Sequence, residues 1–179
     1  MAKTNDELLA ILSQFALEEK VVSAEPFGNG HINDTLKVTT DKGEIKYVLQ
    51  RINHLVFTNV EMLQHNIHVV TTHIREKLEA KGETDIDRKV LTFLPTKDGK
   101  YYYFDGDSYW RVCLFIPRSK SYEEVTPELS YEAGKAFGDF QLMLSDLPEG
   151  TLGETIPNFH NTPKRFETFL KAVEENKSG

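Results

Sequence analysis

The residues best suited to bind a ligand lie together between positions 27 and 35. Glycines and polar side chains are mixed closely here, in the order Gly28, Asn29, Gly30, His31, Ile32, Asn33, Asp34 and Thr35. Glycine has no Cβ, so the backbone can approach a ligand closely and adopt a positive φ at little cost. Successive backbone N–H groups in such a turn can point at an anion such as phosphate. The stretch therefore suits a phosphate-binding turn, and the alternative is an ordinary turn held by its own side chains.

A β-hairpin follows this turn and positions it. The segment up to Thr40 and the segment from Ile45 to Ile52 both alternate in polarity, and Asp41-Lys42-Gly43 joins them. Two such runs around a short Asp/Gly turn are a hairpin signal. The glycine-bearing turn is therefore expected at the mouth of a hairpin.

The other elements predict an α+β chain. Thr4 and Glu7 form a capping box that opens a short helix. Apolar residues recur at three and four positions between Asn59 and Lys81, which predicts a long helix whose Ile67, Val70 and Ile74 face a sheet. The remaining elements are expected as strands over 21–27, 89–94, 100–104 and 108–116, and as helices over 127–147 and 163–175. The fold expected is one twisted antiparallel sheet with one long helix packed on it.

Composition narrows the class of protein. The 179 residues carry a net charge of −7, which argues against a nucleic-acid-binding surface. The single Cys113 fits a reducing compartment, and no apolar stretch approaches the roughly 20 residues that span a bilayer. We therefore expect a cytoplasmic protein without a nucleic-acid or membrane partner.

Several stretches resemble the N-acetylhexosamine 1-kinases, in the aminoglycoside phosphotransferase and choline kinase-like superfamily. The likeness runs from about Asn5 to the last residue. It is carried by G-N-G-H-I-N-D-T at 28–35, Y-V-L-Q-R-I-N-H-L-V-F at 47–57, Tyr109-Trp110-Arg111-Val112, Gly138-Asp139-Phe140-Gln141, Glu154-Thr155-Ile156 and the stretch 159–166.

The resemblance implies a division of the chain and a nucleotide site. Residues 1–116 would be a protein-kinase-like N-terminal lobe, 117–125 an interlobe linker, and 126–179 the incomplete start of a helical C-terminal lobe. In such folds a glycine-bearing hairpin covers the phosphates of ATP. The phosphates would therefore lie on the turn from Gly28 to Thr35, Asn29 included, and adenine at Phe115 and Ile116. The basic residue of the third strand falls at Gln50 or Arg51, and strand alternation lets only one of them face the nucleotide.

The catalytic motif of that family is missing from this sequence. No H-x-D-x-x-x-x-N occurs, so the chain is expected to hold neither a catalytic residue nor the Mg²⁺ ligands, and to be inactive alone. The family implies ATP, Mg²⁺ and a sugar whose anomeric hydroxyl accepts the phosphoryl group. Two alternatives are another small acceptor (an amino alcohol, homoserine or an aminoglycoside) and a non-enzymatic binding module.

Other residues that could do chemistry have simpler explanations. His65, His68 and His73 do not converge on one side of the predicted helix, which favours a solvated polar face over a metal site. Cys113 falls in an apolar strand and is expected to be an inert packing thiol. Asp105 and Asp107 flank Gly106 in a predicted turn. The apolar stripes of the last two helices predict self-association.

Overall fold

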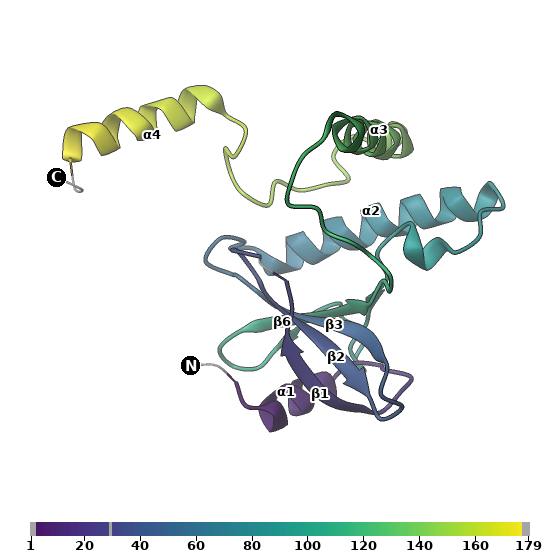
Figure 1. Cartoon of the computed structure of the whole chain (residues 1–179). Coiled ribbons are helices and arrows are strands. Elements are labelled where there is room, and N and C mark those ends of the chain that lie inside the picture. The colour runs from purple at the N-terminus through teal and green to yellow at the C-terminus, as the bar shows by residue number, and fades with distance from the viewer. Residues whose placement is uncertain (1–2, 29, 177–179) are drawn as a thin grey trace.

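The protein is an α+β fold built on one antiparallel sheet. A computed structural model describes residues 3–28 and 30–176, and the sheet order is β1-β2-β3-β6-β4, with β5 paired to β6. In this part of the chain the sheet has six strands and the helices are α1 to α4 with one short 3-10 turn. Figure 1 shows α1 and α2 on opposite sides of the sheet, and α3 on the far side of α2. The prediction of one antiparallel sheet is confirmed.

Helix α1 (Asn5–Leu12) covers the first face of the sheet. Its capping box is present: the Thr4 side chain accepts from the Glu7 backbone N–H, and the Glu7 carboxylate accepts from the Thr4 N–H at 2.7 Å. The main hydrophobic core lies beneath this helix. It combines residues of α1 and Phe15, which follows the helix, with the inward residues of four strands: Leu8, Ile11, Leu12, Phe15, Ala24, Val38, Tyr47, Leu49, Trp110 and Val112. We call this side of the sheet the α1 face.

The predicted hairpin forms β2 (Asp34–Thr40) and β3 (Ile45–Ile52), and β1 (Val21–Pro26) pairs with β2. Gly43 takes a φ of +79° in the connecting turn, a conformation that favours glycine. Because side chains alternate along a strand, Leu49 lies in the α1 core while Ile52 lies on the opposite side. We call that side the α2 face.

Helix α2 (Val60–Ala80) matches the predicted helix closely. Asn59 caps its N-terminus, Lys81 is the C-cap, and Gly82 follows with a φ of +70°. Its N-terminal half packs on the α2 face, where Val60, Leu63 and Ile67 cluster with Ile52, Phe57, Tyr102 and Tyr109.

The prediction that the whole apolar stripe of α2 meets the sheet is wrong for its C-terminal half. Val70 and Ile74 instead cluster with Leu78, Val90, Ile86, Met143 and Leu144. The reason is length: 21 residues at 1.5 Å per residue span about 31 Å, so the helix extends past the sheet. Its second half packs on the segment after α2 and on the end of α3.

The strands between α2 and the last strand are shorter than predicted. The structure has a 3-10 turn at Ile86–Arg88, then β4 (Phe93–Leu94), β5 (Tyr103–Phe104) and β6 (Tyr109–Leu114). The expected strand over 89–94 is reduced because Val90 packs against α2 instead of joining the sheet. Strand β6 is central in the sheet, since it lies between β3 and β4 with Trp110, Val112 and Cys113 buried.

Helices α3 (Pro127–Leu144) and α4 (Thr162–Glu175) end the described chain. Both helices leave their apolar stripes exposed: neither has a buried residue, and Phe137 is 71% exposed. Met143 and Leu144, at the end of α3, pack against the C-terminal half of α2. Figure 1 shows α4 standing apart from the sheet. No helix among residues 3–28 and 30–176 is long and apolar enough to cross a membrane.

Candidate functional site

The glycine-bearing turn joins β1 to β2 and exposes its backbone. Gly28 has a φ of +79°, where a side chain would be strained. Phe27 N–H donates to the Thr35 carbonyl and closes the base of the turn. Within the described residues, no acceptor meets the backbone N–H of Gly28, Gly30, His31 or Ile32. These free donors suit an anion. Asn29, also predicted to bind nucleotide, lies outside the described residues.

The turn is tied to the end of β3 by one side chain. The Asn33 Oδ1 accepts from the Asn53 N–H at 2.9 Å. His31 and Ile32 are exposed at the tip and line a cavity of about 440 Å³, together with Asp34, Arg51 and residues 52–55, 107 and 108. The turn is therefore anchored at its second half and open at its tip.

A larger cavity of about 700 Å³ lies on the α1 face beside the same turn. Its lining comes from the start of α1, the ends of β1 and β2, and the β5–β6 turn, and includes Gly28, Gly30, Asn33, Thr35 and Arg51. Leu8 and Trp110, both buried, belong to its floor. Part of the predicted nucleotide turn thus borders a cavity on the face away from α2.

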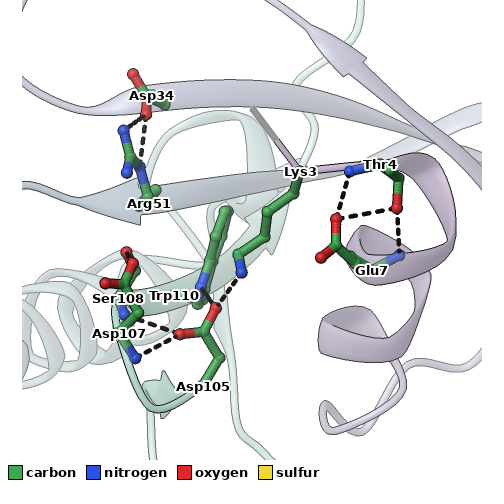
Figure 2. Close-up of polar contacts among 9 residues, drawn as sticks. All are labelled: Lys3, Thr4, Glu7, Asp34, Arg51, Asp105, Asp107, Ser108 and Trp110. Atoms are coloured by element: carbon green, nitrogen blue, oxygen red, sulfur yellow. Dashed lines mark hydrogen bonds and ion pairs between the residues drawn. The ribbon is translucent and has the colours of Figure 1, made fainter. Parts of the chain in front are cut away.

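Arg51 lies on the α1 face, where it is paired with a carboxylate. Its Nε donates to Asp34 Oδ2 at 2.6 Å, and its Nη2 contacts the same oxygen (Figure 2). Asp34 and Arg51 are directly opposite each other in the β2–β3 register. The pair is exposed, so the charge of Arg51 is already matched by its neighbour.

A single carboxylate organises the β5–β6 turn at the edge of this cavity. Asp105 accepts from the backbone N–H groups of Asp107 and Ser108, from the Trp110 indole at 2.8 Å, and from the Lys3 ammonium at 2.9 Å (Figure 2). Burial alone would raise the pKa of Asp105, but these donors outweigh it and hold the pKa well below its usual range. Asp105 is therefore a structural anion of the turn that orients Trp110 and Lys3.

The α2 face carries a different set of polar groups. Gln50, next to Arg51 in β3, donates from Nε2 to Thr35 Oγ1 at 3.0 Å and accepts from Arg111 Nε at 3.0 Å. Arg111 also donates to Gln64 Oε1 of α2 at 3.4 Å, and Gln64 donates to the Tyr101 carbonyl. Gln50 therefore faces α2, and Arg51 faces away from it. This hydrogen-bonded row links β2, β3, β6 and α2.

Arg111 has no carboxylate beside it. Its guanidinium lies over the Phe93 ring, 5.2 Å from the centroid, and no ion pair joins it to any described residue. Burial lowers the pKa of Arg111, and arginine nevertheless keeps its charge. The α2 face thus holds a largely buried positive charge that neutral groups surround.

Two aromatic rings bring the glycine turn and the end of β6 together. Phe27 and Phe115 meet edge to face with their centroids 5.8 Å apart. Phe115 is held by its N–H, which donates to the Lys46 carbonyl at 2.8 Å. Ile116 follows, partly buried, and its carbonyl accepts from the Ser119 hydroxyl. The predicted phosphate and adenine segments therefore touch through Phe27 and Phe115.

The described residues that the sequence predicts to bind nucleotide divide between two faces of the sheet. Gly28, Gly30, Asn33, Thr35 and Arg51 border the α1-face cavity, while Gln50 faces α2 and Phe115 contacts Phe27. Arg111 and Gln64 are the functional candidates that sequence reasoning missed. One signal was available for Arg111, which is a charged residue inside the otherwise apolar run of β6.

The histidines of α2 serve separate contacts. His65 Nε2 lies 3.2 Å from the Thr151 carbonyl, His68 stacks on Tyr101, and His73 Nε2 lies 2.9 Å from Asp146 Oδ1. Residues 3–28 and 30–176 contain no group of three or more His, Cys, Asp or Glu side chains that could hold a metal ion. No protein-family model matches the chain.

Proposed function

We propose that this chain is the N-terminal, nucleotide-binding portion of an ATP-dependent sugar 1-kinase. The intact protein would transfer a phosphoryl group to the anomeric hydroxyl of an N-acetylhexosamine, in the manner of the family that the sequence resembles. The sheet with its long helix would be the kinase-like lobe, and α3 and α4 would begin the helical lobe.

The contact between Phe27 and Phe115 is the observation that carries this proposal. Phe27 leads into the glycine turn and Phe115 directly follows β6, two residues before the proposed linker, and their ring centroids lie 5.8 Å apart. A nucleotide needs phosphate donors and an aromatic or apolar surface for its base within one site. The turn on one side of this contact has backbone N–H groups that no described residue accepts, and Phe115 on the other side offers its aromatic ring. Flat aromatic groups such as adenine pack well against phenylalanine.

The order of side chains on the α2 face supports a nucleotide site at the same place. Val48 and Cys113 are opposite each other in the β3–β6 register, on the side that faces α2. This pair is apolar, and Gln50 and Arg111, two residues further along the strands, form the next pair on the same face. The face therefore runs from apolar to cationic, in the order that the base and phosphates of ATP require.

Mg²⁺ would neutralise phosphate charge in the intact enzyme, and the described residues offer no cluster to hold it. Its ligands are proposed to lie in the helical lobe of the family, together with the catalytic base. The residues described here would bind and orient ATP without transferring its phosphoryl group. Without the metal and the second lobe, binding should be weak, with a Kd in the millimolar range, about 4 kcal/mol.

An amide-resolved NMR titration with ATP tests the proposal. We expect the largest amide shifts in Gly28–Thr35 and in residues 114–119, and no ATP hydrolysis by the 179-residue chain. Shifts clustered elsewhere, or none, would refute the nucleotide site. Hydrolysis by the purified chain would instead show that it holds its own catalytic groups.

A further inference from the structure

Nucleotide phosphates bound on the α2 face would need a positive charge there, and β3 does not supply one. Gln50 occupies the position in β3 that faces α2 and is neutral, while Arg51 points to the opposite face and pairs with Asp34. Lys37, a lysine on the α2 face, is already paired with a carboxylate, because its Nζ lies 3.5 Å from Glu25 Oε2.

Arg111 differs from these cations because its charge is unmatched. The described residues place no carboxylate against its guanidinium, and its two hydrogen bonds go to the amide oxygens of Gln50 and Gln64. A charge removed from water without a counter-charge is costly to hold. A bound anion would remove that cost, so the site favours one.

The free donors of Arg111 are still accessible. A guanidinium has five N–H donors, and only Nε and Nη1 are bonded to described residues. Among the described residues, two buried side-chain atoms lack a hydrogen-bond partner: Glu19 Oε2 and Thr40 Oγ1. Arg111 Nη2 is not one of them. The unbonded Nη2 of Arg111 therefore keeps contact with solvent. Two parallel N–H groups of one guanidinium match the oxygens of a phosphate.

Position also favours a phosphate. Arg111 is linked through Gln50 to Thr35 by two hydrogen bonds of 3.0 Å each. Thr35 is the second residue of β2, which begins where the glycine turn ends. The hydrogen-bonded row therefore connects the guanidinium to the strand that carries this turn.

We propose that Arg111 supplies the positive charge for the nucleotide phosphates, and that Gln50 and Gln64 hold its guanidinium in position. This inference rests on the proposed nucleotide-binding function and names the cation of that same site. The pair of a strand lysine and a helix glutamate, typical of protein kinases, is here replaced by an arginine on the neighbouring strand between two neutral amides.

Titrations of the full chain with ATP, inorganic tripolyphosphate and adenosine test this assignment. Arg111→Gln should raise the Kd for ATP about tenfold and abolish the response to tripolyphosphate, because a charge-assisted contact is lost. Adenosine binding should stay unchanged. Arg165→Gln is the matched control: the same exchange is made in α4, where the guanidinium donates to the Phe159 carbonyl. It should leave all three titrations as in the wild type.

A second measurement needs no variant and therefore does not depend on how Arg111→Gln folds. The Arg111 Nε–H resonance of the wild type should shift on addition of tripolyphosphate. An unchanged resonance, or an Arg111→Gln chain that binds tripolyphosphate like the wild type, would overturn the inference even if ATP binds. Binding of tripolyphosphate through Arg111 without any adenosine binding would support the anion site and overturn the nucleotide function. A wild type that binds none of the three would overturn both.

Discussion

Asn66 and Gly153, 87 residues apart in the chain, form a reciprocal pair of hydrogen bonds. The Asn66 amide donates to the Gly153 carbonyl at 2.7 Å, and the Gly153 N–H donates to the Asn66 Oδ1 at 3.0 Å. A Cβ at position 153 would lie 2.5 Å from the Met62 Sδ, so the backbone approaches α2 very closely. This pair fastens the segment between α3 and α4 to the helix that packs on the sheet.

Asn66→Ala should release that segment from α2. Both hydrogen bonds disappear and a net contribution of about 1 kcal/mol per bond is lost. Amide hydrogen exchange at Gly153 should accelerate by about tenfold or more, while exchange in β3 stays unchanged. Asn66→Asp is the control, because it keeps the acceptor for the Gly153 N–H and should show a smaller effect. Equal protection of Gly153 in Asn66→Ala and the wild type would contradict the role of the pair.

Local signals allowed the sequence to predict most elements of this fold. The caps of α2 and its apolar period depend on neighbours within four residues, and the helix was predicted to within one residue at each end. The Asp41–Gly43 turn likewise fixed the hairpin of β2 and β3. The predicted strand over 89–94 was too long because Val90 packs against α2. This is a tertiary contact that no local sequence pattern indicates.

The candidate site was less predictable, for the same physical reason. The turn around Gly28 and Gly30 is visible in the sequence because glycine and Asx residues have local conformational preferences. The row from Thr35 through Gln50 to Arg111 depends on the register of β3 against β6, and Gln64 joins it only because α2 crosses that face. No local pattern specifies those two relationships.

The contact between α2 and the end of α3 should weaken in acid. Asp146 accepts from Lys77 and from His73, and these bonds lower the pKa of Asp146 from 3.8 to about 2. A depressed carboxyl pKa contributes stability above the unfolded value, and this is lost as the pH falls from about 4 towards 2. The difference in thermal midpoint between the wild type and Asp146→Asn should therefore shrink across that range. A difference independent of pH between 6 and 2 would contradict it.

Cys113 should be protected from thiol reagents. Its side chain is 7% exposed and burial raises the pKa of Cys113 to about 11, so only about one thiol in a thousand is ionised at pH 8. Labelling by a disulfide reagent should be about 100-fold slower than in urea. Since Cys113 lies on the α2 face, ATP should slow labelling further if nucleotide binds there. ATP without effect would argue against that face, and the chain has no other cysteine to confuse the signal.

Helices α3 and α4 should drive self-association. Phe166 and Phe169 of α4 stack on each other with their ring centroids 6.3 Å apart, yet the two side chains are 58% and 59% exposed. Helix α3 likewise has no buried residue. Contiguous apolar patches of several hundred Å² mark interaction sites, and a second copy can cover both helices. Sedimentation should show association of the wild type that rises with concentration. The double exchange Phe166→Glu and Phe169→Glu should reduce it, whereas Leu55→Glu should not, because Leu55 is 84% exposed but lies before α2. A strictly monomeric wild type at high concentration would contradict this prediction.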